Sequence, residues 1–197
     1  MMLDDKRIGF GLTGSHCTLE EVIPMINGLK DEGAEVIPFV SHTVQTTETK
    51  FGTPNHWLDS IEKAAGREVV NSIPKAEPYG PKTPLDAMLI APMTGSSMSK
   101  FANAQTDSPV LMAAKATLRN SSPVVLAIST NDALGLNASN LATLLQMHHV
   151  YFVPLGQDNP YKKPTSLVAR MEDIPQTIEA AIRGEQYQPL FIEKFND

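Results

Sequence analysis

The sequence has 197 residues, of which 42% are hydrophobic and 19% charged, and its formal net charge is −6. A chain of this size and composition buries enough apolar surface for one core, so we predict a single domain over residues 1–197. Nucleic-acid binding needs clustered positive charge, whereas no cationic run is longer than a pair such as Lys162-Lys163. The composition therefore argues against a nucleic-acid partner.

Membrane and disulfide-dependent classes are disfavoured as well. The longest apolar runs are much too short to cross a bilayer, and residues 1–7 carry acidic side chains where a signal peptide has an apolar segment. The single cysteine, Cys17, allows neither an internal disulfide nor a thiolate cage for a metal. These features predict a cytoplasmic protein with no metal site.

Along the chain, short apolar runs alternate with amphipathic segments. Strands are predicted at residues 8–12, 35–40, 88–92, 124–128 and 150–154. Helices are predicted from a capping box at Thr18 to a stop at Gly33, over 54–65, 98–104, from Ser108-Pro109 onward, and over 137–147 and 174–183. Pro38 favours either an edge position or a terminating position for the second strand, and the four prolines of residues 74–84 predict a loop.

This alternation predicts the fold class. Strand, helix, strand in regular order favours parallel pairing with helices on both faces, which is an α/β, three-layer, doubly wound parallel sheet. In such sheets ligands bind beyond the carboxyl ends of the strands. The residues that follow each strand are therefore the candidates for a site.

Small hydroxyl side chains and glycine follow four of the predicted strands. These residues let backbone amides approach an anion closely, and two of the turns lead into helix N-termini. They also occur in ordinary loops and helix caps, which is the alternative interpretation. Because four such turns are expected at one edge, we favour a pocket for a phosphate-bearing cofactor or substrate, built from Thr13, Gly14, Ser15, His16, Ser41, Thr43, Thr94, Gly95, Ser96, Ser97, Ser129 and Asn131.

Residues 9–14 also match the pattern G-x-G-x-x-G of dinucleotide-binding proteins. In that motif the glycines lie in the turn after the strand, whereas Gly9 and Gly11 fall inside the apolar run. A mononucleotide suits the pattern better, with NADP as the alternative. His16 is either a donor to the phosphate or a solvent-facing loop residue, and no residue is predicted to be catalytic.

Residues 90–104, Ile-Ala-Pro-Met-Thr-Gly-Ser-Ser-Met-Ser-Lys-Phe-Ala-Asn-Ala, resemble a signature of the flavoprotein family of cysteine decarboxylases and flavin prenyltransferases. In that signature Ala-Pro leads into Ser-Ala-Asn-Thr and then a helix with Ala-Lys and Ala-Asn-Gly. Thr13-Gly14-Ser15, Asp86 and the segment from Pro123 to Asn131 match at family spacing, so the resemblance covers about residues 7–155.

The resemblance implies a Rossmann-like flavoprotein fold, a homotrimer or higher oligomer, and FMN, or phosphate or another anion in its place. Gly14 and Ser15 would bind the cofactor phosphate with Ser41 or Thr43, residues 94–97 would hold the phosphate or ribityl chain, and Ser129 and Asn131 would face the isoalloxazine. Ser96 replaces the asparagine of the signature. The histidine of the decarboxylases is missing near residues 77–79, so decarboxylation is not expected.

Within the family, residues 7–17, 106–119, 129–137, 152–158 and 168–172 are similar to one subunit of an oxidoreductase of sporulating bacteria. This implies a protein of the mother-cell cytoplasm that acts with an NADP-binding partner subunit to aromatise a small cyclic dicarboxylate. Lys100, Lys115 and Arg119 are candidates to hold the substrate's charge. The alternatives are a non-catalytic subunit that stabilises its partner, and a flavin-binding protein with another substrate.

Overall fold

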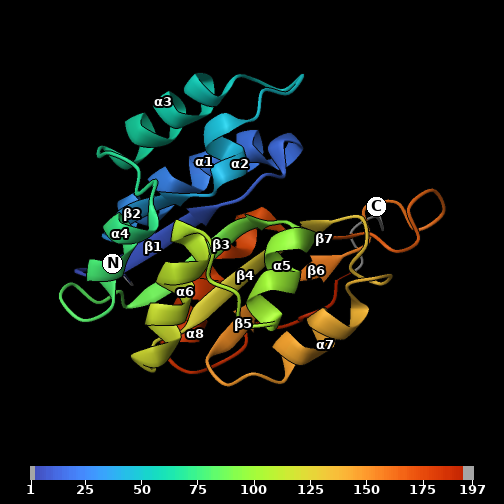
Figure 1. The fold of residues 1–197 in the computed structure, drawn as a ribbon. Helices are drawn as coiled ribbons and strands as arrows, with labels where there is room; N and C mark the ends of the chain where they lie inside the picture. The colour runs from blue at the N-terminus through green and yellow to red at the C-terminus, as the bar shows by residue number, and fades with distance from the viewer. Residues whose placement is uncertain (1–2, 193–197) are drawn as a thin grey trace.

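The computed structural model describes residues 3–192 as a layered arrangement of helices and one central sheet (Figure 1). The elements in chain order are β1 (Arg7–Leu12), α1 (His16–Asp31), β2 (Glu35–Val40), α2 (His42–Thr46), α3 (Pro54–Ala65), α4 (Ile73–Ala76), η1 (Glu77–Tyr79), β3 (Ala87–Met93), α5 (Gly95–Ala102), α6 (Pro109–Arg119), β4 (Val124–Thr130), α7 (Ala138–Leu145), β5 (Val150–Phe152), β6 (Leu155–Gly156), β7 (Leu167–Ala169), η2 (Met171–Asp173) and α8 (Ile174–Ile182).

The sheet confirms the predicted α/β class. Its order is β2-β1-β3-β4-β7-β6, with β5 also paired to β4. The pairs β1–β2, β1–β3, β3–β4 and β4–β5 are parallel, whereas β7 pairs antiparallel with β4 and β6 antiparallel with β7. The short β6–β7 hairpin is the part that sequence analysis did not predict. β2 lies at an edge, as Pro38 indicated.

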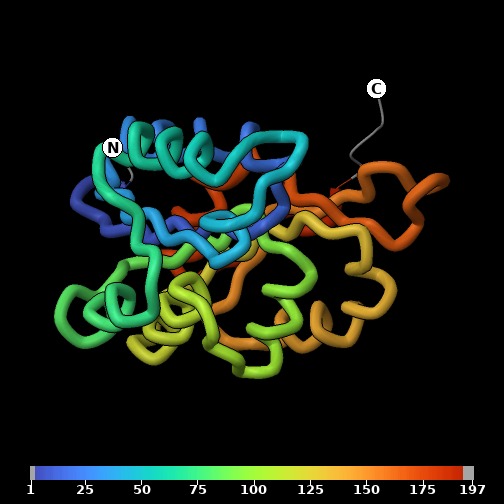
Figure 2. The backbone as a smooth tube through the Cα atoms, turned by 45° about the horizontal axis from the view of Figure 1, so that its top comes forward, coloured from blue at the N-terminus to red at the C-terminus, as the bar shows by residue number. Residues whose placement is uncertain are grey.

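Helices cover the sheet on both sides, as the predicted three layers require. Figures 1 and 2 show α1 and α3 on one side of the sheet and α5, α6 and α7 on the other, and α8 lies with α1. The central strands β3 and β4 are buried along nearly their whole length, because helices pack on both of their faces. The predicted single domain over residues 1–197 includes residues 1–2 and 193–197, which lie outside the described part.

Two helix starts differ from the prediction. The capping box at Thr18 is wrong, because α1 already begins at His16 and Thr18 lies buried in its first turn. α5 begins at Gly95 rather than near residue 98, with Thr94 as its N-cap. Both helices therefore start directly at the strand ends, which brings their first turns closer to the expected pocket.

Of the other local predictions, the two helix ends are confirmed and the proline-rich loop is wrong. Gly33 follows α1 with φ +92°, and Ser108 caps α6 by accepting a hydrogen bond from the amide of Leu111, as predicted. The proline-rich segment is not a plain loop, because it forms α4 and the 3-10 turn η1. Within residues 3–192, no helix combines the length and the apolar character needed to span a membrane.

The first two glycines of the G-x-G-x-x-G pattern serve packing inside the sheet. A Cβ on Gly9 would lie 2.5 Å from Sδ of Met88, and one on Gly11 would lie 2.6 Å from Cγ1 of Val110. β1 needs glycine at these positions because β3 and α6 approach it closely. The motif therefore no longer supports dinucleotide binding, because neither Gly9 nor Gly11 belongs to a phosphate-binding turn.

Candidate functional site

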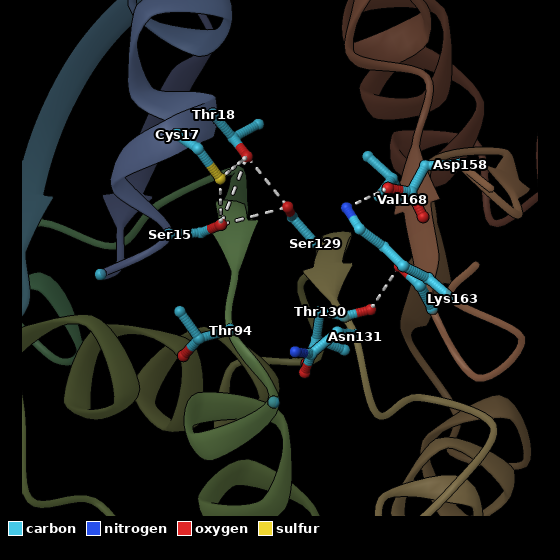
Figure 3. A pocket seen from close by; sticks show the side chains of 13 residues that line it. Ser15, Cys17, Thr18, Thr94, Ser129, Thr130, Asn131, Asp158, Lys163 and Val168 are labelled. Carbon is cyan, nitrogen blue, oxygen red and sulfur yellow. Dashed lines mark hydrogen bonds and ion pairs between the residues drawn. The ribbon is translucent and has the colours of Figure 1, made fainter. Parts of the chain in front are cut away.

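A pocket of about 530 Å³ lies beyond the carboxyl ends of β1, β3 and β4 (Figure 3). It combines three strand-end turns with the segment between β6 and β7. The residues that line it are Gly14, Ser15, Cys17, Thr18, Thr94, Gly95, Ser129, Thr130, Asn131, Asp158, Lys163, Ser166 and Val168. Its position is the one that the switch-point rule assigns to ligands in doubly wound sheets.

Thr13 joins the first and third strand-end turns. Its hydroxyl donates to the carbonyl oxygen of Pro92 over 2.6 Å and accepts from the amide of Thr94 over 3.0 Å. The side chain is 1% exposed and does not line the pocket. Thr13 was expected to contact the cofactor, but here it holds together the two turns that do line the pocket.

The N-terminus of α1 opens onto the pocket. Ser15 is the N-cap, yet its hydroxyl makes no capping bond and instead lies 3.2 Å from Oγ of Ser129 and 3.3 Å from Oγ1 of Thr18. Thr18 and Ser129 are 2.9 Å apart, and Figure 3 shows the three hydroxyls pointing toward one another. The first amides of a helix have no partner within the helix and carry partial positive charge. This end of α1 can therefore receive an anion.

A second helix N-terminus, that of α5, borders the same pocket. The hydroxyl of Thr94 accepts from the amide of Ser97 over 3.2 Å and donates to Oγ of Ser97 over 3.0 Å. Thr94 and Gly95 line the pocket, while Ser96 and Ser97 are not among its lining residues. Two helix dipoles thus point their positive ends at one cavity, an arrangement that favours phosphate or carboxylate groups.

Gly95 is fixed by a polar network behind the pocket wall. Asp132 accepts from Oγ1 of Thr130 over 2.6 Å and from Nδ2 of Asn137 over 2.8 Å. A Cβ on Gly95 would lie 2.5 Å from Oδ1 of Asp132. The network therefore sets how close α5 comes to the end of β4.

The fourth wall of the pocket comes from the segment between β6 and β7. β7 pairs with the end of β4, Ser129 opposite Val168 and Thr130 opposite Leu167, and so carries Lys163 and Asp158 to the pocket. Nζ of Lys163 donates to Oδ2 of Asp158 over 2.9 Å. Sequence analysis missed both residues. The one available signal was the Lys162-Lys163 pair, and nothing local placed it at a strand end.

The ion pair keeps both groups charged. Burial opposes ionisation of the Asp158 carboxyl, but the nearby hydroxyl of Ser166 and the hydrogen bond from Lys163 outweigh it and hold the pKa of Asp158 below its ordinary value. The hydrogen bond to Asp158 and the negative charge of that carboxylate raise the pKa of Lys163. The pocket therefore has a permanent cation facing the two helix N-termini.

The twelve predicted site residues divide into two groups. Gly14, Ser15, Thr94, Gly95, Ser129 and Asn131 line the pocket, and Thr13, His16, Ser41, Thr43, Ser96 and Ser97 do not. The alternative of a solvent-facing His16 is wrong, because the residue is 7% exposed and its Nδ1 lies 3.0 Å from the carbonyl oxygen of Gly14. Thr43 packs on Gly14, where a Cβ would lie 2.6 Å from its Cγ2. The binding roles of all twelve stay predictions.

The cations proposed from sequence for the substrate do not reach this pocket. Lys100 pairs with Asp107 over 2.6 Å, and Lys115 and Arg119 line a separate cavity of about 340 Å³ beside Glu77 and Gly80. None of the three lines the strand-end pocket. Among the described residues that do line it, Lys163 alone carries a positive charge.

The donor set fits a phosphate-bearing group. Within residues 3–192, no three His, Cys, Asp or Glu side chains gather to hold a metal ion. Two helix N-termini, a glycine in each adjoining turn and a cluster of hydroxyls supply hydrogen-bond donors to an anion. A doubly wound sheet with such a pocket at its carboxyl edge is the arrangement found in α/β proteins that bind phosphate-bearing ligands.

Comparison with known proteins places the chain within that class. The profile of the flavoprotein family matches residues 1–183, and the chain belongs to this family. The chain is 60% identical over 193 residues to the B subunit of dipicolinate synthase from Bacillus subtilis (strain 168), an alignment that covers 98% of this chain and 96% of that protein.

Two solved structures resemble the chain to different degrees. The crystal structure of the B subunit of dipicolinate synthase from Bacillus halodurans C superposes with a TM-score of 0.91 and 63% identity, covering 99% of this chain and 100% of that one. The FMN-dependent cysteine decarboxylase SpaF superposes with a TM-score of 0.67 at 15% identity, covering 93% and 99%. The second likeness concerns the fold alone.

Proposed function

We propose that this chain acts as the B subunit of a dipicolinate synthase, in the cytoplasm of the mother cell during sporulation. With the NADP-binding A subunit of that enzyme it would oxidise a dihydrodipicolinate-type ring to the aromatic diacid dipicolinate. The ring loses a hydride and a proton, and the NADP⁺ held by the partner is the final hydride acceptor. The gain of aromaticity makes this step favourable, so the protein's main task is to orient the substrate and the acceptor.

The observation that carries this proposal is the charge distribution of the strand-end pocket. Two helix N-termini lie on one side and the ammonium group of Lys163 on the other, so the cavity can bind anionic groups at both sides. A phosphate-bearing cofactor and a dicarboxylate ring both meet that requirement. The 60% identity to the B subunit of dipicolinate synthase identifies which dicarboxylate to test first.

We further propose that FMN is the cofactor, with phosphate or another anion as the alternative occupant. When bound, the flavin would supply a two-electron acceptor between substrate and NADP⁺. Gly14, Ser15, Thr94 and Gly95 would hold its phosphate through the first amides of α1 and α5. Ser129 and Asn131, at the end of β4, would contact the remainder of the cofactor. A homotrimer or higher oligomer, as implied by the family resemblance, belongs to this proposal.

Decarboxylation is not part of the proposed activity. The region where the decarboxylases have a histidine forms η1, and Tyr79 packs edge-on against Phe39 with ring centroids 5.1 Å apart. The guanidinium of Arg7 also lies over the Tyr79 ring, 5.9 Å from its centroid. These contacts tie the segment to β1 and β2, and a tyrosine packed in this way does not replace the missing histidine.

Two measurements test the proposal. The purified chain should carry a flavin absorption band, and the released cofactor should be FMN by mass spectrometry. The A subunit together with this chain should form dipicolinate from the cyclic precursor and NADP⁺ faster than the A subunit does on its own. Equal rates with and without this chain would assign it a non-catalytic, stabilising role, which is the second candidate function.

A further inference from the structure

The segment between β6 and β7 places one lysine at the mouth of the strand-end pocket. We infer that Lys163 binds a carboxylate of the cyclic dicarboxylate substrate, and that Asp158 is a positioning residue that holds the ammonium group in place. The inference rests on the function proposed above and identifies which residue of the chain recognises the substrate's charge.

The geometry of Lys163 leaves it free to take a ligand. Its ammonium group has three N–H donors, of which the bond to Oδ2 of Asp158, over 2.9 Å, uses one. The side chain is 57% exposed, and Figure 3 shows it extending past Asp158 toward Ser129 on the opposite wall. Two donors therefore remain for an anion inside the pocket.

The backbone around Lys163 is held on both sides. Its amide donates to the carbonyl oxygen of Asn159 over 2.7 Å, and its own carbonyl accepts from the amide of Ser166 over 3.1 Å. Nε2 of Gln157 closes the segment by donating to the carbonyl oxygen of Pro164 over 2.8 Å. A lysine on a pre-formed turn loses less conformational entropy on binding than one on a free loop.

The charge arrangement matches a ligand with two anionic groups. Asp158 neutralises part of the Lys163 charge, so the pair by itself attracts an anion weakly. The N-termini of α1 and α5 add partial positive charge across the cavity. A ring that carries a carboxylate on each side of its nitrogen, or a dicarboxylate beside a bound phosphate, offers an anionic group to each of these positive regions, whereas a neutral ring offers none.

The neighbouring Lys162 supplies a matched control. It is exposed, it carries the same charge one residue earlier, and it does not line the pocket. The amide of Lys162 donates to Oδ1 of Asn159 over 3.0 Å, and this bond does not involve its side chain. Replacing either lysine removes one positive charge from the same turn, but only the replacement of Lys163 removes a charge from the pocket lining.

The experiment compares Lys163→Met, Lys163→Arg, Asp158→Asn and Lys162→Met in the complex with the A subunit, by steady-state oxidation of the cyclic dicarboxylate. A hydrogen bond to a charged group contributes enough that its loss should raise KM at least about tenfold in Lys163→Met. We expect a smaller effect on kcat, partial recovery in Lys163→Arg, an intermediate KM in Asp158→Asn and wild-type values in Lys162→Met. Flavin absorption should stay at the wild-type value in all four variants, and loss of the partly exposed Lys163–Asp158 pair should lower the thermal midpoint only slightly.

The outcomes separate this inference from the proposed function. A wild-type KM in Lys163→Met, or an equal rise in Lys162→Met, would overturn the role of Lys163 while leaving the synthase activity intact. A wild-type complex that is no faster than the A subunit without this chain would overturn the proposed function, and this inference with it.

Discussion

Gly95, the first residue of α5, is the position where a single methyl group tests the polar network behind the pocket. An added Cβ would lie 2.5 Å from Oδ1 of Asp132, 2.7 Å from Oγ1 of Thr130 and 2.9 Å from Nδ2 of Asn137. Real Cβ atoms do not approach that closely, so Gly95→Ala forces Asp132 to move. Asp132 is held by two hydrogen bonds of 2.6 Å and 2.8 Å, and moving it weakens both.

The magnitude follows from these two opposing effects. Hydrogen bonds to a charged group contribute ~1.5–3 kcal/mol each, and the variant keeps part of that by relaxation. Alanine is favoured over glycine in helix interiors by at most ~1 kcal/mol, and by less at a first position. We expect Gly95→Ala to lower the free energy of unfolding by about 2 kcal/mol.

Gly28→Ala is the matched control for this substitution. Gly28 lies inside α1, and a Cβ there would meet no heavy atom within 4 Å. It should raise the free energy of unfolding by ~0.5–1 kcal/mol, since only helix propensity changes. Urea denaturation of both variants measures the two signs. A Gly95→Ala protein as stable as the wild type would show that the network around Asp132 does not constrain α5.

Two further predictions concern charge and capping. The hydrogen bond from Arg67, over 2.6 Å, outweighs burial and, with Arg7, lowers the pKa of Glu35 below its ordinary value of 4.5. A lowered carboxyl pKa stabilises the fold at pH values above the ordinary pKa, and this stabilisation is lost as the pH falls through the lowered pKa. The difference in the free energy of unfolding between wild type and Glu35→Gln should therefore be ~0.2–1 kcal/mol at pH 7 and vanish in acid. A difference that persists at low pH contradicts the role of the ion pair. Thr94→Ala removes the N-cap of α5 and should lower the free energy of unfolding by about 1 kcal/mol, whereas Thr94→Ser should keep the cap and the stability. Thermal unfolding measures both variants. Equal stability of the two would mean that the Thr94 hydroxyl does not cap the helix.

The sequence predicted the parallel part of the fold because its signals are local. Apolar runs marked the five parallel strands, and Ser108-Pro109 and Gly33 marked helix ends within one or two residues. The start of α1 was wrong because Ser15 and Thr18 both have the chemistry of an N-cap, and local sequence does not decide between them. Packing against the end of β4 decides it, since Thr18 is drawn inward to the hydroxyl of Ser129.

The sequence likewise predicted only part of the candidate site. Four strand-end turns were predicted to converge, because the carboxyl ends of parallel strands share one edge. Three of them contribute to the pocket, and six of the residues proposed there line it. Ser41 and Thr43 follow β2 at the sheet edge, where Thr43 packs on Gly14 and does not line the cavity. The distance of an edge strand from the centre of the sheet is not encoded in the turn itself.

By itself, the sequence determined the strand order along the chain, the acidic character, and the hydroxyl and glycine residues of the turns. Only the tertiary structure decided that Lys163 faces those turns. That outcome depends on the antiparallel pairing of β7 with the last residues of β4, between segments that are distant in the chain and too short to carry a periodic pattern. Such pairing is set by the free edge that β5 leaves along β4, and an edge exists only once the sheet has formed.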